Sequence, residues 1–429
     1  MAPQAGPPPN APRPNVPQQP ITARRRTIGA SLGSLPVTNL VLIEVGLAIG
    51  LILLAIDNKL VYEAIGVLVL ALVFAFLRWS GRWFTQWVGL TLRYTFRSHS
   101  RVADPLPPAA EEQVGVEEAT VLGPDDPRVN VLRLVVPDLI VAHGTDHERR
   151  QVGLAWHQGA WTAVLLVDPA PGLITPLGAT PNLPLGALAP CLEDRGVVLD
   201  AIQVIWHCYP GSAALPMTSP ALASYLEVLG PLPAAARRTT WVAVRLDPRR
   251  CPAAIVERGG GVVGSHRALI GALSRVRSAL EGRGVPTRPL DPDELLRSGV
   301  SAAELIGGAR SGTRVGLTER WTGVTAAGIG HASYAITRWP QGRNVNSINA
   351  LTGVRALSAT VTMSVSPSGE DGQVGLRGLV RVSARTPGEL ADANQRLHTM
   401  AQRLNVSLTP LRGLQVSGLA ATLPLGGAA

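Results

Sequence analysis

LPVTNLVLIEVGLAIGLILLAI, residues 35–56, and LVYEAIGVLVLALVFAFL, residues 60–77, are two apolar runs separated only by Asp57-Asn58-Lys59. Each run is long enough, or nearly so, to cross a hydrocarbon core of about 30 Å as a helix. Three polar residues leave no room for a folded domain between the runs. The pair therefore predicts a two-helix transmembrane hairpin over residues 35–78. Everything after it is then expected on the same side of the membrane as the N-terminus.

The charges that flank the two runs predict which side this is. Arg24-Arg25-Arg26 precede the first run, and in the turn Lys59 is offset by Asp57. Five arginines follow the second run, at positions 78, 82, 93, 97 and 101. Because short flanks rich in Lys and Arg stay in the cytoplasm, both termini are predicted to be cytoplasmic. A cleaved signal peptide would have a shorter apolar core and a cleavage site in place of a second span.

The formal net charge of +9 is concentrated beside the membrane. Residues 1–104 contain nine Arg and one Lys against four acids, which gives +6, and the rest of the chain contributes +3. A basic residue near anionic headgroups contributes about 1 kcal/mol of attraction, so the lipid bilayer is an expected partner. Nucleic acid is not, because the nearly neutral remainder has no basic stripe. The three Cys follow no metal or disulfide pattern, which fits a reducing cytosol.

Three residues of the first run are candidates for contact with another membrane subunit. Gly46 and Gly50 form a GxxxG, which lets helices approach closely. Glu44 lies within the apolar run, where an acid costs on the order of 3 kcal/mol and usually faces protein. We therefore predict that Glu44 pairs with a polar group of a neighbouring subunit. The alternative is that Glu44 lies shallow enough to reach the cytoplasmic headgroups.

The segment after the second run predicts an amphipathic juxtamembrane helix over Ser80–Arg101. Aromatic residues recur there at helical spacing with arginines between them. Amphipathic rings at the headgroup level, with Arg beside them, are typical of membrane-surface helices. The predicted membrane-interface anchors are Trp79, Arg82, Trp83, Trp87, Arg93 and Arg97. The alternative is that the aromatic stripe packs against the rest of the protein.

The remainder of the chain predicts an α+β cytoplasmic region, because strands grouped with occasional helices argue against regular βα alternation. Helices are expected over Arg267–Glu281 and Pro387–Leu404, each preceded by an N-cap residue. Apolar runs bounded by turn residues predict strands at Val129–Val136, Val152–Trp156, Trp161–Val167, Val197–His207, Trp241–Leu246, His331–Trp339, Ala359–Ser366 and Val374–Ala384.

Both halves of this region have the order strand, strand, long helix, short strand, which suggests a repeated β-β-α-β unit. The predicted domains are a disordered Pro-rich cytoplasmic tail (1–34), the hairpin (35–78), a juxtamembrane helix and linker (79–104) and two cytoplasmic α/β halves (105–310 and 311–429).

None of the motifs predicts catalysis. Gly259–Gly264 satisfies G-x-G-x-x-G and opens onto a helix, but the preceding strand ends well before it, so a flexible loop is favoured over a dinucleotide site. His143–Glu148 matches no metal-ligand spacing. His207 and Cys208, adjacent on a strand, point to opposite faces. A P-loop is excluded because no Lys follows Lys59. We predict no catalytic residue, no cofactor and no metal ligand.

The chain resembles the EccE family of mycobacterial ESX (type VII) secretion systems, and within it the fifth ESX paralogue. The hairpin, Arg314–Trp321 and His331–Tyr334 carry the resemblance most clearly, and the order of features extends it over essentially the whole chain. It implies a non-catalytic peripheral subunit of an inner-membrane secretion complex. Such a subunit would contribute structure and stability to a hexameric assembly.

The resemblance also implies the partners. These are EccB, the ATPase EccC and the multi-span subunit EccD, with a mycosin protease associated on the outer side. The alternative function is a membrane-tethered enzyme that binds a nucleotide or a lipid-linked substrate, with Gly259–Gly264 as its phosphate cradle.

Overall fold

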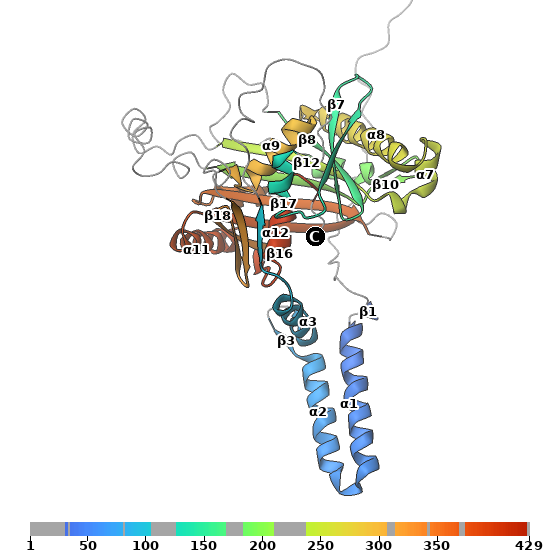
Figure 1. The fold of residues 1–429 in the computed structure, drawn as a ribbon, viewed down its shortest axis with the longest axis vertical. Helices are drawn as coiled ribbons and strands as arrows, with labels where there is room; N and C mark the ends of the chain where they lie inside the picture. Colours follow the sequence, from blue (N-terminus) through green and yellow to red (C-terminus); the bar gives the residue numbers. More distant parts are fainter. Residues whose placement is uncertain are drawn as a thin grey trace, which may run out of the picture.

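The computed structural model describes residues 31–32, 35–79, 82–103, 126–168, 183–209, 237–306, 314–340, 344–368 and 374–426. Two apolar helices project from a larger body that contains a sheet (Figure 1). We call the described part of residues 100–426 the sheet domain. The predicted tail at 1–34 falls almost wholly outside the described residues, as does the segment 104–125.

The two apolar runs form the helices α1 (Val37–Ile56) and α2 (Val61–Phe76), which lie side by side and are joined through a short 3-10 helix at Asn58–Leu60. By length and composition α1 is able to cross a membrane, whereas α2 is a shorter apolar helix of 16 residues. The residues buried between them are mostly small, which lets the two backbones approach closely. They are Asn39, Gly46, Gly50, Ala64, Ala71 and Ala75.

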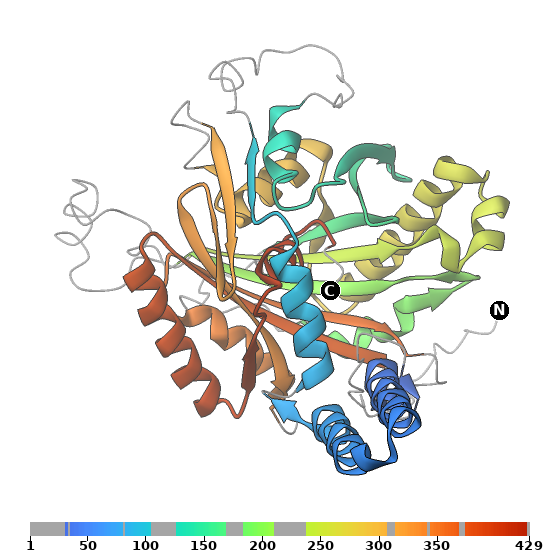
Figure 2. The same cartoon turned by 60° about the horizontal axis from the view of Figure 1, so that its bottom comes forward.

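The juxtamembrane helix is shorter than predicted and does not continue α2. It is α3 (Phe84–Thr95), whereas the sequence predicted a helix over Ser80–Arg101. Between α2 and α3 the chain reverses through a two-residue antiparallel ladder, β3 (Arg78–Trp79) against β4 (Arg82–Trp83). The reversal carries α3 back beneath the sheet domain, as Figure 2 shows with the bottom of the molecule brought forward.

The sheet domain is built on one 13-stranded sheet. Its order is β5-β14-β15-β16-β18-β17-β11-β12-β8-β7-β6, with β19 beside β16 and β13 beside β8. The bounds are β5 (Ser100–Ala103), β6 (Ile140–Thr145), β7 (Gln151–His157), β8 (Ala160–Val167), β11 (Ala201–Tyr209), β12 (Arg237–Leu246), β13 (Thr287–Pro289), β14 (Val315–Arg320), β15 (Gly323–Ala326), β16 (Ile329–Arg338), β17 (Ser358–Pro367), β18 (Val374–Ala384) and β19 (Ser407–Pro410). Short ladders also pair β1 (Ser31–Leu32) with β2 (Leu35–Pro36) and β9 (Glu193–Asp194) with β10 (Val197–Val198).

Most predicted strands are present with shifted ends, but the strand predicted at Val129–Val136 is wrong. That segment contains the helix α4 (Pro127–Leu132). The Asp126 carboxylate accepts a hydrogen bond from the Arg128 N–H at 2.8 Å, and Pro127 occupies the first turn. An Asp cap followed by Pro starts a helix, and these signals override the β-branched residues that follow. The strand predicted at Val197–His207 is divided between β10 and β11.

The predicted β-β-α-β unit is present in both halves. β8, β11, β12, α8 (Gly261–Glu281) and β13 of the first half correspond to β16, β17, β18, α11 (Pro387–Arg403) and β19 of the second. The halves meet where β11 pairs with β17, and the sheet has the same strand order read outward from that pair in either direction. Each unit is followed by a helix, α9 (Pro292–Ala302) in the first half and α12 (Gln415–Ala420) in the second.

The correspondence reaches single residues where α8 and α11 end. Gly284 and Asn405, 121 positions apart, both have left-handed backbone, with φ of +79° and +54°. The residue after each of them donates its N–H to the carbonyl five positions back, at 3.1 Å and 2.8 Å. Further on, the N–H of Leu290 donates to β8 and the N–H of Leu411 donates to β16. A spacing of 121 residues therefore relates equivalent positions of the two units in this region.

Helices cover both faces of the sheet. The core on one face includes the buried sides of α8 and α11, and the core on the other face lies beneath α4, α9 and α12. Along β11, Val204 contributes to the first core and its neighbour Ile205 to the second, because successive side chains of a strand point to opposite faces. The central strands are accordingly buried on both sides.

Candidate membrane anchor and its junction with the sheet domain

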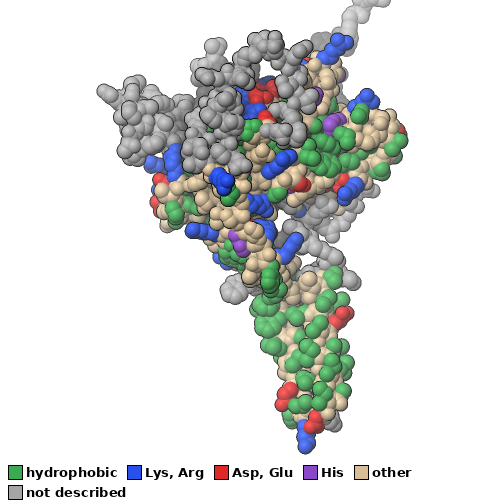
Figure 3. Space-filling model, in the orientation of Figure 1, with side chains coloured by type: hydrophobic (Ala, Val, Ile, Leu, Met, Phe, Trp, Pro, Cys, Tyr) green, Lys and Arg blue, Asp and Glu red, His purple; other side chains and the backbone are tan. Residues whose placement is uncertain are grey.

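The surface of the helix pair is apolar along its length. Space-filling atoms show hydrophobic side chains over most of the projecting helices, with most of the charged groups at the far end (Figure 3). Extended apolar surface of this kind marks contact with lipid or with another protein. Its most exposed members are Tyr62, Ile56, Leu51, Ile52, Leu70, Ile65, Phe76, Val69 and Val73.

The small-residue face of α1 is directed at α2. A Cβ built on Gly46 would lie 2.4 Å from the Cβ of Ala71, and one built on Gly50 would lie 3.4 Å from the Ala64 carbonyl oxygen. The GxxxG pair therefore packs against the second apolar helix of its own chain. Glu44 is exposed on the outer surface of α1, away from this contact.

Asn39 makes buried hydrogen bonds at the end of the helix pair that adjoins α3. Its side chain is 1% exposed, and its amide donates to the Ala75 carbonyl oxygen at 2.6 Å. Its amide oxygen accepts a hydrogen bond from the Thr85 hydroxyl of α3. Beside it the rings of Phe74 and Phe84 stack with centroids 4.6 Å apart. One buried amide thus links α1, α2 and α3.

Replacing Asn39 with alanine should destabilise this end by about 1 kcal/mol, the usual net contribution of such hydrogen bonds between apolar helices. We expect a lower thermal unfolding midpoint for the detergent-solubilised full chain. Thr38→Ala is the matched control, because its exposed hydroxyl makes one contact, at 3.2 Å to the hydroxyl of Thr85. Equal midpoints for the two variants would contradict the role given to Asn39.

Aromatic contacts join α3 to the sheet domain at Trp321, in the turn between β14 and β15. The Trp321 ring lies 5.8 Å from that of Trp87 and 5.0 Å from that of Tyr94, which meets it edge-on. The guanidinium of Arg412 lies over the Trp87 ring, 6.0 Å from its centroid, which is within the range of a cation–π contact. Gly413, with φ of +68°, passes so close that a Cβ there would lie 2.6 Å from the Trp321 ring.

Glu319 is the polar centre of the junction. Its side chain is buried, forms an ion pair with Arg97 and accepts a hydrogen bond at 3.0 Å from the N–H of Val416, in α12. Its backbone N–H donates to the His99 carbonyl at 2.7 Å, and its carbonyl accepts from the Tyr94 hydroxyl at 3.4 Å. Burial, together with the negative charge of Glu319, raises the pKa of Tyr94. One carboxylate therefore ties the segment after α3 to both β14 and α12.

The predicted interface anchors differ in their surroundings in the structure. Trp87 and Arg97 contact the sheet domain, as in the alternative of packing against the rest of the protein. Trp83 is partly buried and Arg93 is exposed. The side chains of Trp79 and Arg82 lie outside the described part of the chain.

No motif in the sequence predicted a functional role for Asn39, Glu319 or Trp321. Asn39 carried the one available signal, since a polar amide near the start of an apolar run has to find a partner. Glu319 and Trp321 lie in the stretch that carries the family resemblance, but their partners Arg97 and Trp87 are more than 200 residues away in the sequence. No local pattern encodes a contact of that range.

Gly259–Gly264 connects two helices and does not follow a strand. β12 ends at Leu246, and α7 (Pro252–Glu257) lies between it and α8. A Cβ at Gly264 would lie 2.3 Å from the carbonyl oxygen of Ile255, so this glycine permits α7 and α8 to pack closely. Dinucleotide binding needs the strand, the glycine turn and the helix in direct succession. Gly264 is explained by the helix–helix packing, and the three glycines before it by their positive φ.

Gly260→Ala should lower the free energy of unfolding by about 1–2 kcal/mol, because Gly260 has φ of +69° and ψ of 168°, which other residues adopt only with strain. Gly271→Ala is the control with the opposite sign. Gly271 is exposed within α8 with open space around it, so alanine there should add about 0.5–1 kcal/mol. Chemical denaturation of the full chain measures both. A nucleotide-dependent stabilisation that Gly260→Ala removes would instead favour the enzyme hypothesis.

The other chemical candidates have structural partners. Among the described residues no group of three His, Cys, Asp or Glu side chains is arranged to hold a metal ion. The His207 ring is buried and shares a hydrogen bond with the Thr360 hydroxyl at 2.8 Å. Cys191, Cys208 and Cys251 are free thiols and buried.

The family profile and the relatives that match this chain all carry the name EccE. Residues 234–336 match a family profile described as a type VII ESX secretion system translocon, EccE. ESX-5 secretion system protein EccE5 of Mycobacterium marinum is 30% identical over 165 residues, which cover 35% of this chain and 40% of that protein. ESX-1 secretion system protein EccE1 of Mycolicibacterium smegmatis is 38% identical over 73 residues, or 17% and 16% of the two chains. EccE1 of Mycobacterium tuberculosis is 38% identical over 61 residues, 14% of this chain and 13% of the relative.

The matched segments span less than half of each of these relatives. The profile match covers β12, α8, β14, β15 and most of β16, and it includes both Glu319 and Trp321. The family is described as a translocon component and not as an enzyme. Together these matches show that part of the chain, centred on residues 234–336, is similar to the EccE proteins of ESX secretion systems.

Proposed function

We propose that the chain is a non-catalytic structural subunit of an inner-membrane type VII (ESX) secretion complex, and that it stabilises the assembly through its helix pair and its sheet domain. One observation supports this above the others. An apolar helix pair is held to a folded domain by buried contacts on both sides of α3, through Asn39 and through Glu319. Such a connection transmits position and orientation from the membrane to the domain.

In this proposal both α1 and α2 cross the membrane and both termini are cytoplasmic. The exposed apolar surface of both helices and the arginines on either side of the pair support this arrangement. The 16 residues of α2 span about 24 Å, so its ends need flanking residues or a thinner bilayer to complete the crossing. Trp79, Arg82, Trp83 and Arg93, beside the end of α2, are the proposed anchors at the interface.

Labelling of the turn between the helices tests this topology. In the variant Lys59→Cys, a membrane-impermeant maleimide should label intact spheroplasts, since the native cysteines are buried. Gln402→Cys, exposed on α11, should react only after the membrane is opened. Labelling of Gln402→Cys from outside, or of neither variant, would contradict the two-span arrangement.

Glu44 is the proposed lateral contact with a neighbouring membrane subunit. It lies about 10 Å along the axis from the start of α1, and its exposed carboxylate has no ion-pair partner among the described residues. Gly46 and Gly50 support the same contact indirectly, because they hold α2 against the opposite side of α1. The proposed partners are EccB, the EccC ATPase and EccD, with a mycosin protease on the outer side and several copies in a hexameric complex.

Assignment to the fifth ESX paralogue is part of the proposal, supported by the longer match to EccE5 than to the EccE1 proteins. So is the division of the chain into tail, hairpin, juxtamembrane segment and two cytoplasmic halves, which the repeated topology supports.

Mild-detergent extraction and native electrophoresis test the function. The tagged protein should migrate in a megadalton-scale complex and should leave it when the genes for its partners are deleted. Migration as a small species, with the partners unaffected by its loss, would contradict the proposal.

A further inference from the structure

Two surface pockets occupy equivalent positions in the two halves of the sheet domain. The first, of about 470 Å³, lies between the segment that connects β8 to β11 and the last turns of α8. The second, of about 520 Å³, lies between the segment that connects β16 to β17 and the last turns of α11. The spacing of 121 residues carries the helical lining of the first pocket onto that of the second. Arg275, Ser278, Ala279 and Gly282 correspond to Arg396, Thr399, Met400 and Arg403.

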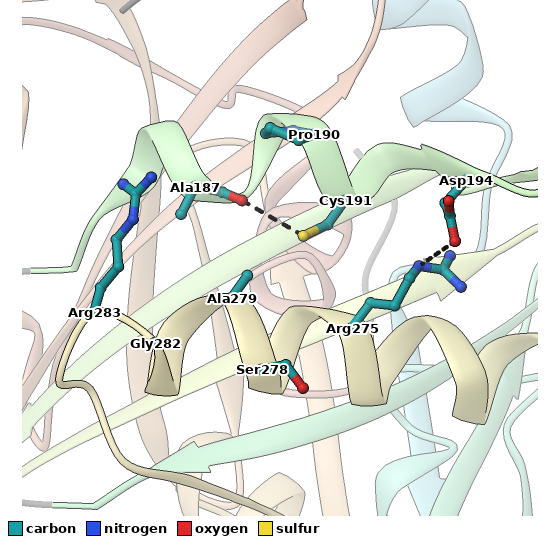
Figure 4. A pocket seen from close by; sticks show the side chains of 9 residues that line it. All are labelled: Ala187, Pro190, Cys191, Asp194, Arg275, Ser278, Ala279, Gly282 and Arg283. Atoms are coloured by element: carbon teal, nitrogen blue, oxygen red, sulfur yellow. Dashed lines mark hydrogen bonds and ion pairs between the residues drawn. The ribbon is translucent and has the colours of Figure 1, made fainter. Parts of the chain in front are cut away.

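The first pocket already contains its own carboxylate. Asp194, from the connecting segment, forms an ion pair with Arg275, in which the carboxylate oxygen lies 3.3 Å from Nε, as Figure 4 shows. The guanidinium of Arg275 is largely covered, and the charge of Asp194 partly offsets the desolvation that lowers the pKa of Arg275. Beside it the Cys191 thiol donates to the carbonyl of Ala187 at 3.5 Å. This hydrogen bond is made within the connecting segment that forms one wall of the pocket. In the first half, therefore, the arginine at this position of the helix pairs with a carboxylate.

The second pocket has the same arginine without an acid of its own to pair with it. Arg396 donates to the backbone carbonyl of Arg355 at 3.3 Å, and the connecting segment contributes a second guanidinium where the first half contributes Asp194. Arg403 adds a third. Asp392 is the one acid in the lining, and among the described residues none of the three arginines forms an ion pair. The lining therefore carries a net charge of +2.

We propose that the second pocket binds a carboxylate-bearing segment of another protein, with Arg396, Arg403 and Arg355 as its contacts. Arginine forms paired, charge-assisted hydrogen bonds with carboxylates, and the first pocket provides that pairing within the chain. The side chains of Gln395 and Thr399 supply further hydrogen-bonding groups, while Val354 and Met400 give the pocket an apolar wall. An acidic residue in an extended segment satisfies all of these. The site is independent of the membrane anchor and extends beyond the proposed structural function.

Fluorescein-labelled hexaglutamate is a direct probe, measured by fluorescence anisotropy on the full chain in neutral detergent. It should bind at low salt and weaken as salt is added. The double variant Arg396→Gln, Arg403→Gln should bind it at least about tenfold more weakly, because two charge-assisted contacts are lost. The matched control is Arg249→Gln with Arg338→Gln, which removes the same charge from exposed positions that line neither pocket. It should stay within about twofold of the wild type.

Three results would overturn the proposal. The first is no binding of hexaglutamate at low salt, and the second is an equal loss in the pocket variant and the control. The third is binding to vesicles containing phosphatidylglycerol that depends on Arg396 and Arg403 while hexaglutamate binding does not, which would make the pocket a lipid-headgroup site. Because all substituted side chains are exposed, the variants should keep the wild-type unfolding midpoint, and this measurement separates lost binding from lost fold.

Discussion

Replacing Glu319 with alanine should destabilise the protein by about 3–4 kcal/mol and release α3 from the sheet domain. The carboxylate is 3% exposed and is shared by Arg97 and the N–H of Val416. Its removal leaves a buried donor at the start of α12 without a partner and an arginine without its acid. Losses of this type are among the largest that single substitutions produce. We expect a lower midpoint in chemical denaturation and faster proteolysis of the segment between α3 and β5.

Glu148→Ala is the matched control for Glu319. Glu148 also pairs with arginines, Arg150 and Arg277, but its side chain is 41% exposed. Surface pairs of this kind contribute at most about 1 kcal/mol. If both alanine variants were destabilised alike, or if Glu319→Ala were as stable as the wild type, Glu319 would not be the centre of the junction.

Gly46→Ile should separate α1 from α2, at a cost of about 3 kcal/mol to their association. A Cβ at this position already lies 2.4 Å from that of Ala71, so a branched side chain forces the two backbones apart. The expected result is a protein that reaches the membrane but is depleted from the large native complex. Without a fixed packing of α1 on α2, the outer surface of the helix pair no longer has a single arrangement for a partner to bind.

Gly66→Ile adds the same side chain to α2 where a Cβ would have nothing within 4 Å. It should leave helix packing unchanged. Equal incorporation of the two variants into the complex would argue that the contact at Gly46 is not needed, and loss of both would point to sensitivity of the outer surface instead.

Local signals were sufficient for the elements that carry them. The apolar runs predicted α1 and α2, and the helices predicted at 267–281 and 387–404 are present as α8 and α11. The predicted start of α8 was wrong, because α8 begins at Gly261 and no side chain caps it. Where two local signals competed the prediction was wrong: the β-branched residues of 129–136 suggested a strand, and the Asp126-Pro127 start produced a helix. β14 and β15 were not predicted, although β14 alternates buried and exposed residues along its length. Short strands of this kind have too few apolar residues to stand out.

The candidate site was less predictable than the fold because it depends on contacts across the chain. Trp87 was expected at the lipid interface, and its ring packs on Trp321. An aromatic stripe records only that a helix face is covered, not by what. The repeated unit was visible as an order of elements, whereas the matched pockets emerged only when equivalent positions on α8 and α11 were compared in space.

Affinity purification of the tagged full-length protein from native membranes in gentle detergent, followed by mass spectrometry, tests the central claim most directly. A structural subunit of an ESX complex should recover an ATPase and a many-span membrane protein in fixed ratio. Recovery of the protein alone, under conditions in which those two proteins remain associated with each other, would contradict the assignment.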